Sequence, residues 1–401
     1  MRQPAGRSRR FLGTLSPGLR GGDSRLLYLL DQGISSGTNF AATIVVARMG
    51  TPRQFGVFSV FLVSYYVIVG FNRAVPHAVA MTLEWEDERA RNGYFFFPAW
   101  VLGGLGALVL VPIMAILEPS FALLPIFLLP LLLQDAVRMH SFALHKPGTA
   151  IASDTIWLAI ELIGFALVST PAAAALVWAG ASMCGALVVR PWLQMRWVRR
   201  PVTVSIVSSA LEYLVLGGFG ILAPLFAGFI ISIRGVGALQ GANVFRGPVT
   251  LLVQGLVAHT MAGPPISRDS CSREALSLSG IIAVATLVFV APIVVLKDVY
   301  GPFLLGPTWP LVDPLIYPTV LSLGVCSTAF GPATVIRKMG LFRLSATVQI
   351  ALTPCFVAFA LLGAAQAGAE GFVNGTTVAY GISATVWWTV LAFVGRAGRP
   401  S

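Results

Sequence analysis

Residues 94–117 read YFFFPAWVLGGLGALVLVPIMAIL and contain no Asp, Glu, Lys or Arg. A helix needs about 20 apolar residues to cross the hydrocarbon core of a membrane, so this stretch predicts a membrane span. After Glu118-Pro119-Ser120 a second apolar stretch, residues 121–144, predicts another. The rest of the chain repeats this alternation of long apolar stretches and short turns.

The composition of the whole chain agrees with a membrane protein. Of its 401 residues 56% are hydrophobic and 11% are charged, and the mean hydropathy is +0.81, whereas about 25% of the residues of soluble globular proteins are charged. These values exclude a soluble enzyme, a secreted disulfide scaffold and a disordered chain. The four cysteines and four histidines are scattered, and no CxxC, HExxH or Walker A motif occurs. We therefore expect no metal site, no cofactor and no use of ATP.

The apolar stretches predict an all-α polytopic membrane protein of about twelve transmembrane helices in two six-helix lobes. The predicted spans are 26–47, 55–81, 94–117, 121–144, 150–168, 172–189, 210–232, 237–262, 275–296, 313–336, 341–363 and 372–395. The expected domains are a basic tail (1–25), an N-terminal lobe (26–190), an inter-lobe linker (191–209), a C-terminal lobe (210–395) and a C-terminal tail (396–401).

The distribution of basic residues predicts the orientation in the membrane. With a cytoplasmic N-terminus, 21 of the 27 Lys and Arg residues fall on the cytoplasmic side, and only Arg48, Arg53, Arg234 and Lys297 fall on the outer side. Cytoplasmic loops carry an excess of Lys and Arg, so both termini are predicted to be cytoplasmic. The same excess accounts for the net charge of +11. No stretch interleaves basic and aromatic residues as a nucleic-acid groove would, and no nucleic-acid partner is expected.

Two arginines inside predicted spans, Arg73 and Arg246, are the first candidates for function. Ionisable side chains at membrane depth are costly and usually face a cavity or a charged partner, and guanidinium is well suited to phosphate oxygens. We therefore interpret Arg73, with its neighbour Asn72, and Arg246 as cavity residues that bind phosphate. Two alternatives stay open for Arg73. Its side chain could extend to the cytoplasmic interface of the membrane, or it could form an ion pair with an acid such as Asp31.

Polar residues of the first predicted span form a second candidate group. Asp31 and Asn39 are eight residues apart and lie roughly on one helix face. They could form a proton or cation coupling site, or Asp31 could be a packing or interfacial carboxylate. Asp135 and Arg138, spaced i and i+3, could pair on one helix face.

Several short motifs are spread along the predicted spans. They are DQGISSGTNF (31–40), ARMG (47–50), FGVF (55–58), LQDAVR (133–138) with Trp157, GALQGA (237–242), FRGP (245–248) and LGPTW (305–309). With these motifs the chain resembles the polysaccharide flippases, such as the O-antigen (Wzx-type) flippases. These belong to the multidrug/oligosaccharidyl-lipid/polysaccharide (MOP) exporter superfamily, which also contains the lipid II flippases.

The resemblance implies a MATE-like exporter of two lobes that works by alternating access. Its substrate would be an undecaprenyl-pyrophosphate-linked oligosaccharide, moved across a bacterial plasma membrane for polysaccharide biosynthesis. Cavities in the family are lined largely by the first, second, seventh and eighth helices and are often cationic, which fits Arg73, Arg246 and Arg48. With about twelve predicted spans, the chain is expected to lack the two extra C-terminal helices of the lipid II flippases. Implied partners are membrane lipids and the glycosyltransferases or polymerase of the same pathway.

Other functions stay open at this point. A cation-coupled multidrug exporter of the same superfamily is the first alternative, although acids are sparse in the last six predicted spans. A membrane polysaccharide polymerase or ligase is the second, but the predicted outer loop 297–309 is short and apolar for such an enzyme. A partner subunit without transport of its own is the third. We expect a transporter and not an enzyme.

Overall fold

The computed structural model describes residues 23–82, 85, 87–196, 210, 213, 219–262 and 266–396, and no strand occurs in that part of the chain. The expected all-α fold is therefore confirmed. The main helices are α1 (Asp23–Met49), α2 (Pro52–Asn72), α3 (Ala78–Thr82), α4 (Glu88–Leu117), α5 (Leu128–Ala143), α6 (Pro147–Phe165), α7 (Pro171–Ala186), α9 (Phe219–Ala262), α10 (Cys271–Val295), α11 (Lys297–Leu305), α12 (Trp309–Lys338) and α13 (Phe342–Arg396). Most of the predicted linker and both tails lie outside the described residues.

Two of these helices are too long for a single crossing, and each is broken where the sequence predicts a turn. The 44-residue helix α9 has a non-helical residue at Ser232, and the 55-residue helix α13 has two, Ala367 and Gly368. A crossing takes about 20 residues at a rise of 1.5 Å per residue. The breaks coincide with the predicted boundaries between the seventh and eighth spans and between the eleventh and twelfth. Eight helices among the described residues are long and apolar enough to cross a membrane.

Glycines allow the two halves of α13 to pack closely on each other. A Cβ atom at Gly375 would lie 2.0 Å from the carbonyl oxygen of Phe359, and Gly368 at the break has a φ of +60°. Only glycine adopts a positive φ of this kind without steric strain. The chain therefore reverses at Gly368 and returns along itself.

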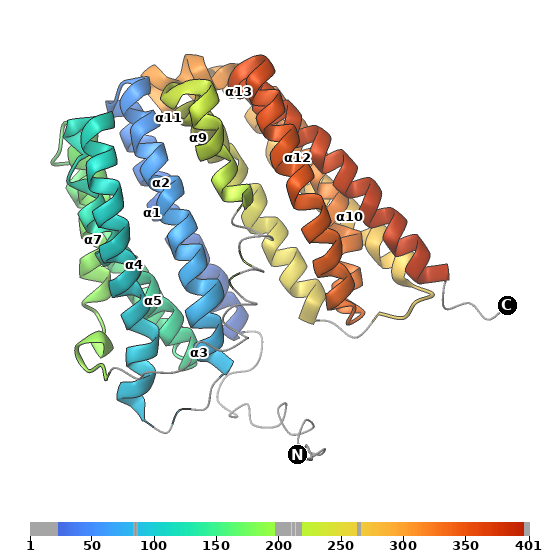
Figure 1. Cartoon of the computed structure of the whole chain (residues 1–401), viewed down its shortest axis with the longest axis horizontal. Coiled ribbons are helices and arrows are strands. Elements are labelled where there is room, and N and C mark those ends of the chain that lie inside the picture. Colours follow the sequence, from blue (N-terminus) through green and yellow to red (C-terminus); the bar gives the residue numbers. More distant parts are fainter. Residues whose placement is uncertain are drawn as a thin grey trace.

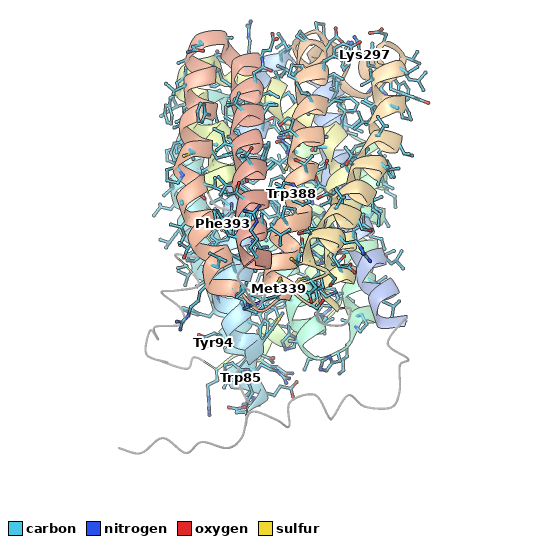
Figure 2. All side chains as sticks on the ribbon, turned by 90° about the vertical axis from the view of Figure 1, so that its right-hand side faces the viewer. Trp85, Tyr94, Lys297, Met339, Trp388 and Phe393 are labelled. Atoms are coloured by element: carbon cyan, nitrogen blue, oxygen red, sulfur yellow. The ribbon has the colours of Figure 1, made fainter. Side chains whose placement is uncertain are left out.

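The helices form two bundles, which we call the first bundle (α1 to α7) and the second bundle (α9 to α13). In Figure 1 the two bundles converge at the upper end, where α1 ends and α11 lies, and diverge toward the lower end, where α13 ends. Figure 2 shows Lys297 at the upper end and Trp85 at the lower end. The first bundle has an aromatic core in which Trp178 makes edge contacts with Phe58 and Tyr65, both at 5.8 Å between ring centroids.

The bundles make their closest backbone approach between α2 and α9. A Cβ atom at Gly56 would lie 2.2 Å from the carbonyl oxygen of Ile233, and one at Gly237 would lie 2.9 Å from the Cα of Gly56. Ile233 directly follows the break at Ser232. Only glycines permit this approach. The contact of Gly56 and Gly237, which we call the glycine junction, therefore fixes how the two bundles meet.

A second set of contacts joins the end of α1 to the turn after α11. The Thr308 hydroxyl donates to the Ala47 carbonyl at 3.3 Å, and the Arg48 guanidinium lies 4.7 Å from the ring centre of Phe303. Phe303 is 62% exposed. These contacts add to the apolar packing of the upper end, where Leu305 and Trp309 belong to the same buried cluster as Val46 and Phe55.

We predict that Gly56→Val separates the bundles at the upper end, because the valine side chain cannot fit against Ile233. Overpacking costs about 1–3 kcal/mol, and about 1.4 kcal/mol is tenfold in population. The converged state should therefore lose about 5- to 150-fold in population. Distances between spin labels at Ser120 and Val299, in a background without the native cysteines, should shift to longer values. Gly104→Val is the matched control, since nothing lies within 4 Å of a Cβ at Gly104. Identical distance distributions in both variants would contradict the prediction.

Candidate functional site

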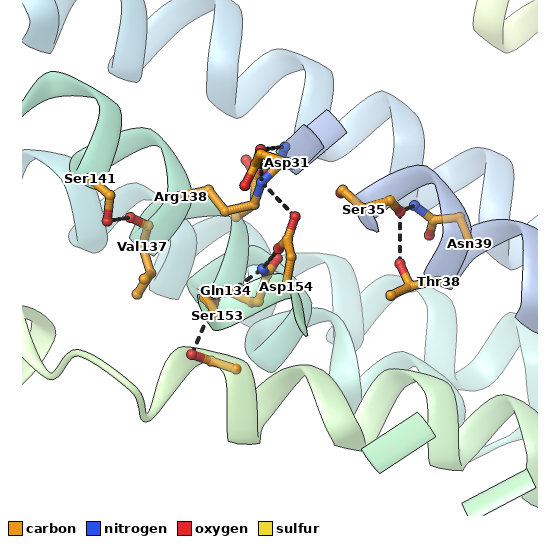
Figure 3. A network of polar contacts seen from close by, with 12 residues as sticks. Asp31, Ser35, Thr38, Asn39, Gln134, Val137, Arg138, Ser141, Ser153 and Asp154 are labelled. Carbon is orange, nitrogen blue, oxygen red and sulfur yellow. Dashed lines mark hydrogen bonds and ion pairs between the residues drawn. The ribbon is translucent and has the colours of Figure 1, made fainter. Parts of the chain in front are cut away.

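A buried guanidinium, Arg138 of α5, ties together three helices of the first bundle. Its Nη2 donates to Oδ2 of Asp31 on α1 at 2.5 Å, and its Nε lies 3.1 Å from Oδ2 of Asp154 on α6. Asp135, one turn back on α5, lies 3.8 Å from Nη1. Figure 3 shows Asp31 and Asp154 converging on Arg138 from the two neighbouring helices. Arginine stays protonated in proteins, so this charge is permanent.

The next turn of α5 extends the network toward α6 and α7. Gln134 donates to Asp154 and, at 3.3 Å, to the hydroxyl of Ser153, which in turn donates to the Gly185 carbonyl of α7 at 2.9 Å. Gln134, Asp135 and Arg138 are neighbours on the helix because residues three and four apart lie on one face. The helical repeat therefore places all three side chains within the bundle.

Arg73 joins the network from the other side. Its Nε donates to Oδ1 of Asp135 at 2.9 Å, and its Nη2 forms an ion pair with the same oxygen. Arg73 begins a π-helical turn, η1 (Arg73–His77), which contains Pro76. Proline removes one backbone hydrogen bond, and π-helical turns inside α-helices are frequent at functional sites.

The linked network contains three carboxylates and two guanidiniums. With every group ionised it carries one more negative than positive charge, and a single added proton makes it neutral. A buried site of low polarity favours neutrality. Among the described residues of the network, the neutral state therefore needs one added proton. Glu161, also buried on α6, has no hydrogen-bond partner for either carboxylate oxygen among the described residues.

The second bundle contains a different kind of site around Arg246 of α9. Arg246 lines two adjoining cavities of about 580 and 270 Å³, which also share Gly220, Phe356 and Tyr380. Its Nη1 donates to the Asn243 side chain at 3.4 Å, and the Tyr380 hydroxyl interacts with the guanidinium. Both cavities are lined by residues of the second bundle.

The larger cavity is cationic. Its described lining includes two guanidiniums, Arg246 and Arg337, and no carboxylate. Its other polar side chains are Thr250, Thr286, Cys326, Ser327, Thr334, Gln349, Thr353, Tyr380 and Ser383. The remaining wall is mostly apolar and includes Phe330, Phe356 and Trp387. The arrangement suits an anion that also carries hydroxyl or apolar groups.

The structure does not gather the three arginines selected from the sequence. Arg246 lines the cavities of the second bundle, Arg73 lies on Asp135 in the first bundle, and Arg48 lies over Phe303 where the bundles meet. The acid beside Arg73 is Asp135, whereas Asp31 binds Arg138. Their roles as phosphate ligands stay predictions.

The two asparagines selected with them lie in the first bundle. Asn72 is fully buried, and neither its Nδ2 nor its Oδ1 has a hydrogen-bond partner among the described residues. Asn39 donates to the Ser35 carbonyl one turn back at 3.0 Å. Asn39 is therefore separate from the Arg138 network in this conformation.

Sequence reasoning missed Arg337 and the central position of Arg138. Arg337 is in the last turn of α12, where a basic residue is easily interpreted as part of the flanking positive charge. The sequence pairs Arg138 with Asp135, because the i, i+3 spacing along one helix identifies neighbours one turn away. Its partners on α1 and α6 belong to other helices, and sequence spacing does not show which residues of two helices meet.

We predict that Arg138→Ala destabilises the protein strongly, because it leaves the buried carboxylates of Asp31 and Asp154 without their cation. Breaking a buried pair from one side costs about 3–5 kcal/mol. Thermal unfolding in detergent should shift well below that of Arg343→Ala, a control on the exposed surface of α13. In the double variant Arg138→Ala/Asp31→Asn part of the loss should be restored. An unfolding temperature equal to that of the control would contradict the network.

Solved membrane transporters resemble this chain over nearly its whole length. An inward-facing multidrug-resistance transporter of the MATE family, in the MOP superfamily, is 13% identical and matches with a TM-score of 0.67 over 91% of this chain and 96% of its own. An outward-facing MATE transporter is 13% identical, with a TM-score of 0.58 over 93% and 94%. A MOP-superfamily transporter from Pyrococcus furiosus, described by the reversed polarity of its binding pocket, is 12% identical, with a TM-score of 0.52 over 94% and 95%.

No protein-family model and no curated protein matches the chain. At 12–13% identity the structural likeness establishes the fold, and the polysaccharide-flippase subtype stays a prediction. The apolar helices and the match over more than nine-tenths of the chain agree on one conclusion. The chain is a multi-pass membrane protein with the fold of the MATE transporters of the MOP superfamily.

Proposed function

We propose that the protein is an alternating-access exporter of a lipid-linked oligosaccharide, with Arg246 as the principal ligand of the substrate's phosphate groups. The observation that carries the proposal is a membrane-depth guanidinium in a cavity whose described wall contains no carboxylate. A cavity of this charge favours an anion, and a guanidinium binds phosphate oxygens through several N–H groups at once. The substrate would be an undecaprenyl-pyrophosphate-linked saccharide of a bacterial plasma membrane.

The remaining wall of the larger cavity supports a saccharide. Ser327, Thr334, Thr353 and Ser383 present hydroxyl groups and Gln349 presents an amide. These groups can both donate and accept hydrogen bonds, as sugar hydroxyls do. The lipid tail would stay in the bilayer, beside apolar side chains such as Leu276 and Leu287 of α10, which are 66% exposed.

Alternating access is supported by the arrangement of the bundles. They converge at the upper end and diverge at the lower end, and the TM-score to the inward-facing transporter exceeds that to the outward-facing one. If the excess of basic residues sets the orientation, the diverging end faces the cytoplasm. The substrate would then enter from the inner leaflet and leave after the upper contacts open.

The first bundle offers a way to couple transport to a proton gradient. Its network of Asp31, Asp135, Asp154, Arg73 and Arg138 is one proton short of neutrality. Uptake and release of that proton would change the charge inside the bundle and bias the two conformations. Glycosyltransferases and a polymerase of the same pathway remain the expected partners.

A cation-coupled multidrug exporter is the second candidate. The buried carboxylates of Asp31, Asp154 and Glu161 favour it, because acids can bind protons or cationic drugs. They lie in the first bundle, however, and two of them lie within reach of Arg138. A cationic drug would also meet Arg246 and Arg337 in the larger cavity, which opposes its binding there.

We predict that Arg246→Ala lowers the translocation rate of a labelled lipid-pyrophosphate-linked saccharide in proteoliposomes by about 10- to 150-fold. A hydrogen bond to a charged group contributes about 1.5–3 kcal/mol, and 1.4 kcal/mol is about tenfold. Arg246→Lys should retain part of the rate, because it keeps the charge and loses the planar donors.

Arg343→Ala on the exposed surface is the control for this experiment, and all variants should elute as one species in size-exclusion chromatography. An unchanged rate in Arg246→Ala would contradict the role of Arg246. Transport of cationic dyes by a protein that leaves the saccharide lipid untouched would support the drug exporter instead.

A further inference from the structure

The larger cavity is long and follows the axis of the second bundle. On the part of α9 after the break at Ser232 its lining extends from Arg246 to Val257, and on α12 from Leu323 to Arg337, while Gly220 lines it from the part of α9 before the break. At 1.5 Å per residue these stretches are about 16 and 21 Å long. The cavity therefore reaches from the middle of the bundle to near its lower end.

Its two guanidiniums lie at opposite ends. Arg246 lies at the upper end of the cavity, beside Asn243 and Tyr380. Arg337 lies in the last turn of α12, two residues before Met339, which Figure 2 shows toward the lower end of the bundle.

Arg337 is half-buried and held in place. Its Nε donates to the hydroxyl of Ser345 on α13 at 2.9 Å, and Ser345 is buried. A long side chain loses much of its rotamer freedom when it is anchored in this way. The guanidinium is thus presented in a defined position on the cavity wall.

The spacing disfavours a single diphosphate held by both arginines at once. Cys326 of α12 lies near Arg246 and precedes Arg337 on the same helix by eleven residues, which is about 16 Å at 1.5 Å per residue. The two phosphorus atoms of a diphosphate share one bridging oxygen and lie much closer together. Two separate contacts, one at each end of the cavity, fit this spacing better than one.

We propose that the larger cavity binds anions in two steps, first at Arg337 near the lower end and then at Arg246 in the middle of the bundle. This inference rests on the proposed function and adds Arg337 as a second substrate ligand. Its ligand class is a phosphate monoester or diphosphate anion. No described carboxylate lines the path between the two sites, and Thr334, Thr353 and Ser327 supply hydroxyl donors along it.

A native cysteine offers a direct test. Cys326 lines the cavity near Arg246, and the Tyr380 hydroxyl interacts with both. The chain has four free cysteines, so Cys184→Ser, Cys271→Ala and Cys355→Ser leave Cys326 as the only thiol. Its rate of modification in detergent is then measured with an anionic and with a cationic methanethiosulfonate of similar size, with and without inorganic pyrophosphate.

The expected result is faster reaction with the anionic reagent, by about tenfold, because a cationic cavity concentrates anions. Pyrophosphate should slow the reaction. Arg337→Gln should remove most of the preference for the anionic reagent, and Arg337→Lys should keep it. Ser345→Ala removes the anchor without removing the charge, so its preference should fall between these two variants.

Several results would overturn the proposal. One is an anionic preference in Arg337→Gln equal to that of the parent, in protein that elutes as one species. Another is a Cys326 that neither reagent modifies, since the cavity would then be closed to anions. The first result leaves Arg246 as a substrate ligand, whereas the second also argues against this cavity as the substrate site. Loss of saccharide transport in Arg246→Ala with unchanged transport in Arg337→Gln would retain the proposed function and reject the two-step path.

Discussion

Burying a charged side chain in a membrane is costly, and the two bundles of this structure compensate for that cost in different ways. In the first bundle Arg138 is surrounded by Asp31, Asp135 and Asp154, so nearly every charge has a partner of opposite sign. In the second bundle the partners of Arg246 among the described residues are a neutral amide and a phenol, with no carboxylate. A charge without a counter-charge at this depth must face a cavity or a ligand. The difference between the bundles is therefore the strongest indication of where the substrate binds.

The fold could be predicted in detail from the sequence, because long apolar stretches and turn residues are local signals. The break at Ser232 falls at the predicted end of the seventh span, and the break at Gly368 falls between the eleventh and twelfth. The site could be predicted only in part. The depth of Arg246 in its span indicated a cavity residue, but the partner of Arg73 is 62 positions away on another helix. Helical periodicity assigns a face and leaves open which helix packs against that face.

The polarity of the larger cavity bears on the choice between the candidate functions. Its described wall has aromatic groups, which cations can contact, but two guanidiniums and no acid, so its charge favours an anion. Reversed pocket polarity is described for a MOP-superfamily transporter of similar fold, from Pyrococcus furiosus. One scaffold can thus present pockets of either charge, because helix packing and pocket chemistry depend on different residues.

The upper closure between Ala47 and Thr308 and between Arg48 and Phe303 is weak. A hydrogen bond contributes about 0.5–1.5 kcal/mol and an exposed cation–π contact about 0.5–1 kcal/mol, whereas reversing a 99:1 preference takes about 5.5 kcal/mol. Most of the cohesion of the upper end must therefore reside in the close approach of Gly56 and Gly237 and in the apolar side chains buried around it, such as Phe55, Leu305 and Trp309. If the bundles alternate as we propose, opening this end means exposing a packed apolar seam, and the two polar contacts add little to that cost.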